Sequence, residues 1–286
     1  MKLGAMSSMY SYAGVPAEQI LERFAKYDLK YVDMMTIGDL QVNSMNREKI
    51  ERIKNKNKQL GLTPSCLIAS VGGNGASSDP EVRNRTAEAV GRAMRAASEM
   101  GFLMVLLFLG EKEPGTAPRQ SWDCMKLFVD RCLQDAEREK IVLTFESNPR
   151  IYRMVNSLEE ASRLLREIPS PFFKATLDMG HLTVCREAPS QILQLKGQII
   201  HAHITDNDGT ADTNETLGTG FTPIAECLAM IDAAGIDETA RRCDLEPVAV
   251  IELGSPEKIS LRSVDRVLER SLDHLRKIDS PYLRQV

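Results

Sequence analysis

The chain of 286 residues contains no dense block of Lys and Arg and no long apolar run. Its formal net charge of −4 makes a nucleic acid an unexpected partner, because surfaces that bind phosphate backbones are rich in basic residues. No stretch approaches the roughly 18 apolar residues of a membrane span, and the N-terminus lacks the apolar core of a signal peptide. We therefore expect a cytoplasmic protein that binds neither nucleic acid nor membrane.

Paired cysteines and a phosphate-binding glycine motif are also missing. The six cysteines form no Cys-x-x-Cys pair, which argues against a structural zinc site and is typical of buried, reduced thiols. The glycine cluster at residues 71–75, "VGGNG", lacks the Gly-x-Gly-x-x-Gly spacing of a dinucleotide-binding fold. An open, doubly wound sheet is therefore the second choice of fold.

What the chain does contain is a regular alternation of short β-type runs with helical patterns. Hydrophobic residues make up 43% of the chain, enough for a large core. Helices are expected to start near Pro16, Asn46, Asp79-Pro80, Ser157, Thr222 and Lys258. Strands are expected at residues 3–8, 30–35, 63–68, 103–109, 141–146, 173–178, 199–204 and 248–253. One strand per about 36 residues predicts a single-domain (β/α)8 TIM barrel over residues 1–286.

The chemistry of such a barrel lies at the carboxyl ends of its strands. Side chains two residues apart on a strand share a face, so the polar residue that ends a strand points away from its bulky neighbour. The alternation turns Phe145, Leu177, Ile204 and Ile251 toward the helices. Four consecutive strands then direct polar side chains toward the barrel axis: Glu146, Asp178, His203 and Glu252.

Three carboxylates in a half-buried mouth are costly unless a positive charge neutralises them. Arg150 is the one basic residue close to these strand ends in sequence. A divalent cation solves the problem, and three oxygen donors with one imidazole suit Mn²⁺, with Mg²⁺, Co²⁺ or Zn²⁺ as alternatives. The competing interpretation is that each acid only caps the helix after its strand. Four such strands in succession favour the metal site.

Two of the four histidines lie in one apolar run, "IIHAHITD", at residues 199–206. If this run is a strand, His201 and His203 project to the same face. His203 lies nearer the rim, where it completes the metal site. His201 is expected one layer lower, with a hydrogen-bonding role inside the barrel. Asp206, just beyond the strand, is a candidate to orient His203 or to bind a substrate hydroxyl.

These segments resemble the xylose isomerase-like barrel superfamily, which includes ketose 3-epimerases and inosose dehydratases. The resemblance spans essentially the whole chain and is strongest in "LTFESNP", "TLDMGH", "HAHITD", "LGTG" and "IELGS". It implies that the four strand-end residues are the metal ligands and that Glu146 and Glu252 are the catalytic acid/base pair. It also implies substrate contacts by His181 and Asn148, and a homo-oligomer is a family expectation.

Other segments depart from the family pattern or leave alternatives open. Tyr10 and Tyr12 could stack on a sugar ring or pack in the barrel wall. The loop "DNDGTADTNETLGTG" lacks the Arg that ketohexose epimerases carry there, which argues against a phosphorylated substrate group beneath it. Its Gly-Thr-Gly turn at residues 218–220 is expected to be structural, although an anion could bind there. The second strand ends with Asp33, where relatives often carry Glu.

The leading functional hypothesis is a metal-dependent sugar isomerase or epimerase that moves a proton next to a carbonyl of a ketose or keto-polyol. The alternative is a lyase on the same scaffold, because the same proton removal permits β-elimination by a dehydratase or a deglycosidase of an oxidised glycoside. A nuclease of the related apurinic endonuclease family is disfavoured, since that family binds three zinc ions with several further histidines. A carbohydrate is the expected small-molecule partner.

Overall fold

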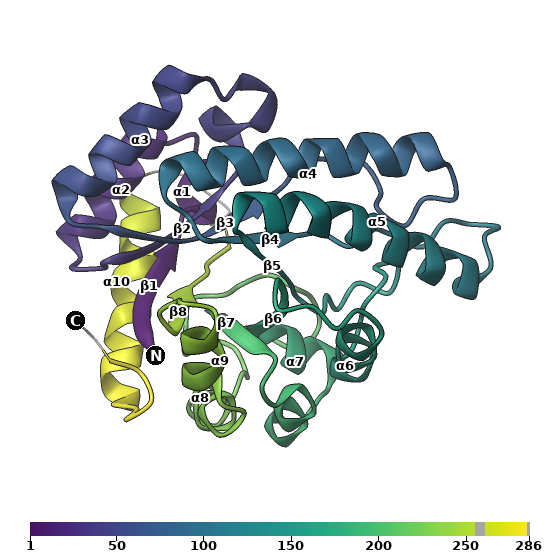
Figure 1. The fold of residues 1–286 in the computed structure, drawn as a ribbon. Helices are drawn as coiled ribbons and strands as arrows, with labels where there is room; N and C mark the ends of the chain where they lie inside the picture. The colour runs from purple at the N-terminus through teal and green to yellow at the C-terminus, as the bar shows by residue number, and fades with distance from the viewer. Residues whose placement is uncertain (255–260, 285–286) are drawn as a thin grey trace.

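The computed structural model describes residues 1–254 and 261–284 and contains a closed barrel of eight parallel strands (Figure 1). The strands follow one another around the barrel in chain order. They are β1 (Lys2–Met6), β2 (Tyr31–Met35), β3 (Thr63–Ala69), β4 (Met104–Leu107), β5 (Val142–Phe145), β6 (Phe173–Asp178), β7 (Ile199–Ile204) and β8 (Val248–Ile251). The predicted TIM barrel is confirmed, and each strand lies within one or two residues of its expected position.

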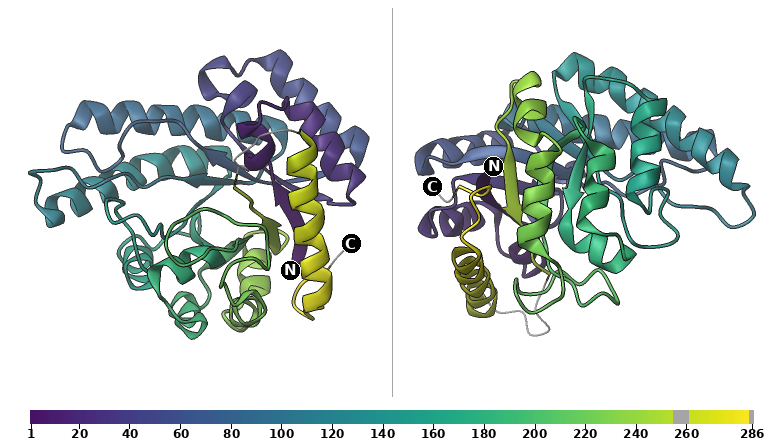
Figure 2. Two further views of the ribbon diagram at one scale, coloured as in Figure 1. Left: turned by 180° about the vertical axis from the view of Figure 1, so that it is seen from behind. Right: turned by 90° about the horizontal axis from the view of Figure 1, so that it is seen from below.

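Helices cover the outside of the barrel between successive strands (Figures 1 and 2). The α-helices are α1 (Ser8–Tyr12), α2 (Ala17–Lys26), α3 (Arg47–Leu60), α4 (Pro80–Met100), α5 (Pro118–Glu139), α6 (Leu158–Glu167), α7 (Met179–Cys185), α8 (Ile224–Ala233), α9 (Ile236–Arg242) and α10 (Leu261–Ile278). Three 3₁₀ helices add η1 (Gly38–Leu40), η2 (Val42–Ser44) and η3 (Pro189–Leu195). No helix within residues 1–254 and 261–284 is long and apolar enough to cross a membrane.

Helix starts follow the capping signals of the sequence. The side chains of Asn46, Asp79 and Ser157 each accept a hydrogen bond from a backbone N–H in the first turn of α3, α4 and α6. Helix α8 begins two residues after the expected start at Thr222. The start expected near Lys258 lies outside the described residues.

The apolar side chains form two clusters, one on each face of the strands. Phe145, Leu177, Ile204 and Ile251 belong to the cluster between strands and helices, as the alternation predicts. The second cluster is smaller and includes Met6, Cys66, Ile68, Leu106 and Val250. The strands are buried on both faces, which is why their sequences are nearly continuous in apolar character.

The two ends of the described chain lie side by side beside β1 (Figure 1). The amino group of Met1 donates to the carbonyl of Tyr282, and Arg284 N–H donates to the carbonyl of Met1. Helix α10 therefore closes the ring of helices beside the first strand, as the left view of Figure 2 also shows. All of these contacts lie away from the loops that follow the strands, so those loops are left to form a site.

Candidate metal centre and active site

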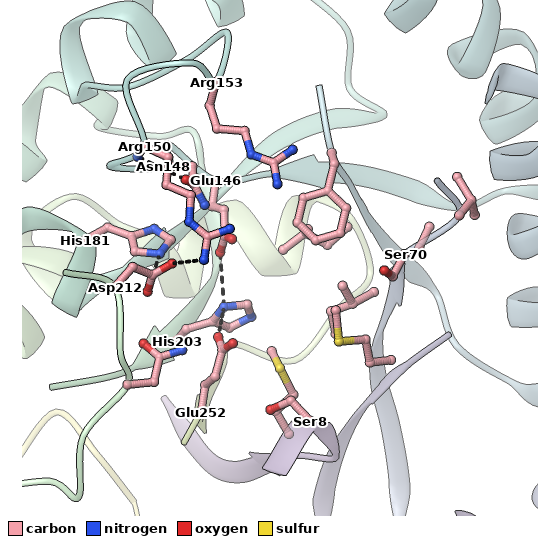
Figure 3. A pocket seen from close by; sticks show the side chains of 18 of the residues that line it. Ser8, Ser70, Glu146, Asn148, Arg150, Arg153, His181, His203, Asp212 and Glu252 are labelled. Carbon is pink, nitrogen blue, oxygen red and sulfur yellow. Dashed lines mark hydrogen bonds and ion pairs between the residues drawn. The ribbon is translucent and has the colours of Figure 1, made fainter. Parts of the chain in front are cut away.

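The carboxyl ends of β5 to β8 bring four polar side chains together at the barrel mouth (Figure 3). The Nδ1 atom of His203 lies 3.0 Å from an oxygen of Glu252 and 3.3 Å from an oxygen of Glu146. Asp178 Oδ2 lies 3.9 Å from the same nitrogen. In the parallel ladder, Asp178 is paired in register with His203, which explains why these two side chains enter the same layer. The predicted set is therefore assembled around one ring nitrogen.

Several of these atoms are buried without a hydrogen-bond partner among the described residues. They are Glu146 Oε2, Asp178 Oδ2 and both ring nitrogens of His203. Buried polar groups normally have a hydrogen-bond partner. Four unpaired polar atoms in one place therefore indicate that the site binds a cation. Asp178, His203 and Glu252 each offer one ligand atom within 4.8 Å of the other two, and Asp178 forms a second such group with Glu146 and His181. Carboxylate oxygens together with an imidazole nitrogen fit a divalent metal such as Mn²⁺ or Zn²⁺.

Helix capping explains only one of these acids. Asp178 Oδ1 accepts hydrogen bonds from the backbone N–H of His181, in the first turn of α7, and from the hydroxyl of Thr205. Its second oxygen stays free for the mouth. Within the described residues no backbone N–H donates to the side chain of Glu146 or Glu252, and the carboxylates of both lie against His203. The capping interpretation therefore does not account for the cluster.

The electrostatics show how strongly the acids and the imidazole act on each other. Burial raises the pKa of Asp178 to about 7, and the charges of Glu146 and Glu252 act in the same direction. Burial lowers the pKa of His203, but its contacts with carboxylates outweigh that effect and hold this pKa well above its ordinary value. Positive charge at His203 thus favours the ionised carboxylates around it, and a bound cation would act on them in the same direction.

A second layer of polar side chains lies directly beneath the mouth. The sequence predicts the role of His201 in this layer but not the identity of its partner. His201 Nε2 lies 2.7 Å from Asp33 Oδ2, and both side chains are fully buried. Asp33 Oδ1 accepts hydrogen bonds from Ser65 Oγ and from the backbone N–H of Cys66. The hydrogen-bonding role predicted for His201 is therefore seen in the structure. Its partner Asp33 was visible in the sequence as the polar end of the second strand.

Asp33 also lies close to His203, the histidine of the candidate metal site. Its Oδ2 lies 3.6 Å from His203 Nε2, on the opposite side of the ring from the three carboxylates at the mouth. A carboxylate behind the second nitrogen fixes the orientation of an imidazole ligand and leaves its first nitrogen for the metal. Burial opposes the charge of Asp33, but His201 and His203 together hold its pKa below the ordinary value.

His181 stands at the edge of the cluster. Its Nδ1 lies 2.7 Å from the carbonyl of Ser147, which fixes the ring, and its Nε2 lies 3.4 Å from Asp212 Oδ1 and 3.9 Å from Asp178 Oδ2. Burial lowers the pKa of His181, but the nearby carboxylates outweigh it and raise this pKa well above its ordinary value. Asp212 comes from the acidic loop after β7 and was missed, because nothing in that loop distinguishes one acid from the next.

The mouth opens into a cavity of about 640 Å³. Its lining includes Glu146, Asn148, His181, His203 and Glu252, and it extends to Tyr12 and Asp212. Arg150, Arg153 and Asp212 also line the cavity. The sequence patterns do not point to them, although Arg150 is close to the end of the fifth strand in sequence. A cavity of this size accommodates a small sugar beside the cluster.

The substrate contact predicted for Tyr10 is wrong. Tyr10 is fully buried in the core, packs edge-on against Phe24 and donates its hydroxyl to Asp265, so it faces away from the cavity. The short helix α1 turns Tyr10 inward while Tyr12 stays exposed at the rim. Of the two tyrosines, only Tyr12 lines the cavity.

Asp206 neither orients His203 nor faces the cavity. Its two oxygens accept the backbone N–H groups of Gly218, Gly220 and Thr222, at 2.8 to 2.9 Å. A Cβ atom at Gly220 would lie 2.3 Å from Asp206 Oδ1, so this glycine permits the close approach. The anion of the Gly-Thr-Gly turn is therefore the carboxylate of Asp206 itself, and the turn is structural as expected.

Comparison with known proteins agrees with this architecture. Residues 21–277 match the family described as "Xylose isomerase-like TIM barrel". No curated protein matches the chain. Among solved structures, the IOLI protein with a bound zinc atom is 17% identical, with a TM-score of 0.82 over 99% of each chain.

Two sugar epimerases are also similar in fold. D-psicose 3-epimerase from Clostridium cellulolyticum H10 is 15% identical, with a TM-score of 0.79 over 98% of this chain and 100% of that one. The 3-keto-D-glucoside 4-epimerase YcjR from E. coli is 17% identical, with a TM-score of 0.71 over 96% and 99% of the two chains. At these identities the likeness concerns the fold. Because the family match covers most of the sequence, this chain belongs to the xylose isomerase-like TIM barrel family.

Proposed function

We propose that the protein is a metal-dependent sugar isomerase or epimerase that moves a proton next to the carbonyl of a ketose or keto-polyol. The observation that supports this most is the cluster of Glu146, Asp178 and Glu252 around Nδ1 of His203, with unpaired buried atoms at the floor of a cavity. The similarity in fold to sugar epimerases supports the substrate class.

In this proposal the four strand-end residues hold one divalent ion, with Mn²⁺ as the expected metal. Such an ion, when bound, polarises the carbonyl and its neighbouring hydroxyl and so acidifies the carbon-bound proton. Glu146 and Glu252 approach the His203 ring from two sides (Figure 3). One carboxylate would remove the proton and the other would return it from the opposite face of the substrate.

The neighbouring polar groups would position the substrate. His181 is held by the carbonyl of Ser147, so its Nε2 is aimed at Asp212 and the cavity. We propose that His181 and Asn148 bind substrate oxygens and that Tyr12 contacts the sugar at the rim. These groups line the cavity beside the acid/base pair, which is where the hydroxyls flanking the reacting carbon would lie.

The test combines metal analysis with proton exchange. Purified protein should contain about one divalent metal per chain, and with Mn²⁺ in D₂O it should incorporate solvent deuterium into at least one member of a panel of ketoses, inososes and 3-keto-glycosides. Folded protein that holds no metal and ignores chelators would contradict the site assignment. Loss of water or release of an aglycone would instead identify a lyase that begins with the same proton removal.

A further inference from the structure

Two arginines enter the cavity from the loop that follows β5. Figure 3 shows the guanidinium groups of Arg150 and Arg153 pointing into the cavity above the cluster formed by Glu146, His203 and Glu252. Both arginines line the cavity. Nothing in the proposed proton transfer uses them, because they are not among the acid/base or metal-binding groups. The two arginines are therefore available to bind a part of the ligand that the acid/base and metal-binding groups do not contact.

Arg153 is held in place by its surroundings but is not fully bonded. Its guanidinium lies 5.6 Å from the ring centres of both Phe108 and Tyr152, and its Nη1 lies 3.2 Å from Glu111 Oε1. Its Nε is buried and has no hydrogen-bond partner among the described residues. The two aromatic rings fix the plane of the group, and this leaves unused N–H donors at a defined position.

Arg150 is even less satisfied. Its Nη2 lies 4.0 Å from Asp212 Oδ2, which is too long for a hydrogen bond. No side-chain hydrogen bond of Arg150 is found in the described part of the chain, and its side chain is 48% exposed. Asp212 has a second neighbour in His181, whose Nε2 lies 3.4 Å from Asp212 Oδ1. Asp212 therefore does not depend on Arg150, and the guanidinium is available to another anion.

The charges of the cavity lining differ between its two ends: Glu146 and Glu252 lie at the cluster, whereas Glu111 and Asp212 each lie beside an arginine that offsets their charge. Apart from the histidines, Arg150 and Arg153 are the only basic residues of the described cavity lining. The acids Glu146 and Glu252 repel an anion from the reacting end of the substrate. Planar guanidinium groups bind carboxylate and phosphate with two parallel hydrogen bonds, a match that neutral hydroxyls do not offer.

We propose that the substrate carries a compact anionic group, a carboxylate or a phosphate, that Arg150 and Arg153 bind at the end remote from the reacting carbon. The inference rests on the proposed isomerase function, because it concerns the same cavity. It adds a substrate class, since it selects acidic sugars over neutral ones. The acidic loop after β7 lies beside Arg150, which favours the single charge of a carboxylate over the double charge of a phosphate.

Binding can be measured without turnover. The Mn²⁺-loaded protein is titrated by calorimetry with D-glucitol, D-gluconate and D-glucitol 6-phosphate, three six-carbon polyols that differ in charge. We expect an anionic polyol to bind at least tenfold more tightly than D-glucitol. In the Arg150→Met/Arg153→Met variant this advantage should disappear. A gluconate advantage over glucitol 6-phosphate would identify a carboxylate site, and the reverse order a phosphate site.

Matched variants separate the site from nonspecific effects. Arg262→Met/Arg270→Met removes the same charge from exposed positions of α10 and should keep the preference. Arg150→Met alone should keep the fold, since this side chain makes no hydrogen bond among the described residues, and it should lose a large part of the preference. Arg150→Lys keeps the charge but not the planar group and should recover part of it.

A second arm follows deuterium exchange with D-fructose, D-fructuronate and D-fructose 6-phosphate in D₂O. For the wild type, we expect kcat/KM to be at least tenfold higher for an anionic member, and the double arginine variant should remove the difference by raising KM. Equal binding of charged and neutral polyols would overturn the inference. So would an anionic advantage that survives in the double variant, because the anion would then be bound by the metal. Absence of bound metal and of exchange would instead contradict the proposed function, whichever polyol binds.

Discussion

Two layers of polar side chains fill the carboxyl half of the barrel, and they differ in how completely their hydrogen bonds are made. In the upper layer, Glu146, Asp178 and His203 all keep buried atoms without a partner in the described structure. In the lower layer, both oxygens of Asp33 are bonded, and the hydroxyls of Thr144 and Thr176 pair at 2.8 Å. Of the described lower-layer atoms named here, only Nδ1 of His201 has no hydrogen-bond partner.

This difference suggests separate roles for the two layers, ligand binding for the upper one and support of the fold for the lower one. A folded core does not leave several acids unpaired without cost, so the upper layer is where we expect a ligand that the chain itself does not provide. The lower layer supplies its own partners and holds the upper one in register. Changes in the upper layer should therefore affect metal binding and reaction, whereas changes in the lower layer should affect orientation and folding.

The largest effect is expected from Glu146→Gln. This change keeps the shape of the side chain but removes the acid/base group, so kcat on any substrate found should fall by about 10²- to 10⁴-fold. Thermal unfolding should be little changed, and Glu99→Gln, at an exposed position of α4, should behave like the wild type. Turnover within threefold of the wild type would exclude Glu146 from proton transfer.

Metal removal should give the next largest change. A metal that binds only the folded state stabilises it by about 2.7 kcal/mol when present at a hundred times its dissociation constant. Dialysis against a chelator should therefore lower the melting temperature, and added Mn²⁺ should restore it. In a Glu146→Gln/Glu252→Gln variant the response to metal should be lost, and a response of wild-type size would place the ion elsewhere.

Asp33→Asn tests the connection between the two layers. The change removes the carboxylate behind His203, so Mn²⁺ affinity should fall by about 10- to 100-fold. Metal titration by calorimetry measures this directly, with Asp130→Asn at an exposed position of α5 as the control. If unfolding becomes easier while metal affinity stays constant, Asp33 supports the fold alone.

Thr144→Val should affect the lower layer only. It leaves the hydroxyl of Thr176 without its partner and should reduce the free energy of unfolding by about 1 kcal/mol in chemical denaturation. The double change Thr144→Val/Thr176→Val removes both hydroxyls and should recover much of that loss. Metal affinity should be unchanged in both variants, and a clear decrease would mean that the layers are not separable.

The smallest effect concerns a carboxylate on the outer surface. Glu167 accepts a hydrogen bond from Trp122, and Lys126 and Arg163 contact it, so its pKa is lowered to about 2. A lowered pKa stabilises the fold above about pH 4.5 and loses that contribution as the pH falls toward 2. For a surface cluster this amounts to less than about 1 kcal/mol. Denaturation curves of Glu167→Gln should lie below the wild type at pH 7 and approach it near pH 2; a constant difference would refute the cause.

The proximity of the four strand-end residues could be predicted because it depends on only two rules. Alternation along a strand decides the face, and the barrel decides which ends share a rim. Partners from distant strands or loops are different: the pairing of Asp33 with His201, or of Asp212 with His181, depends on how the whole barrel closes. Local sequence does not contain that information.

The two wrong predictions have local causes. Tyr10 and Tyr12 are two residues apart and would share a face in a strand, but the chain turns into α1 there, which directs Tyr10 into the core. Asp206 follows a strand as the residues of the candidate site do, yet the backbone N–H groups of residues 218–222 donate to its carboxylate. The return of a loop is set by its conformation, which composition does not reveal.

That return divides the loop after β7 into two parts with different tolerance to change. Residues 218–222 are tied to Asp206, while the segment around Asp208 and Thr210 is bonded mainly to itself and is exposed at Asp208, Thr210 and Ala211. Insertions or grafted sequences at residues 208–211 would leave the tie intact. The exposed residues 208–211 can therefore vary in length and sequence, while Asp206 keeps the base of the loop in place and residues 212–214 continue to line the cavity.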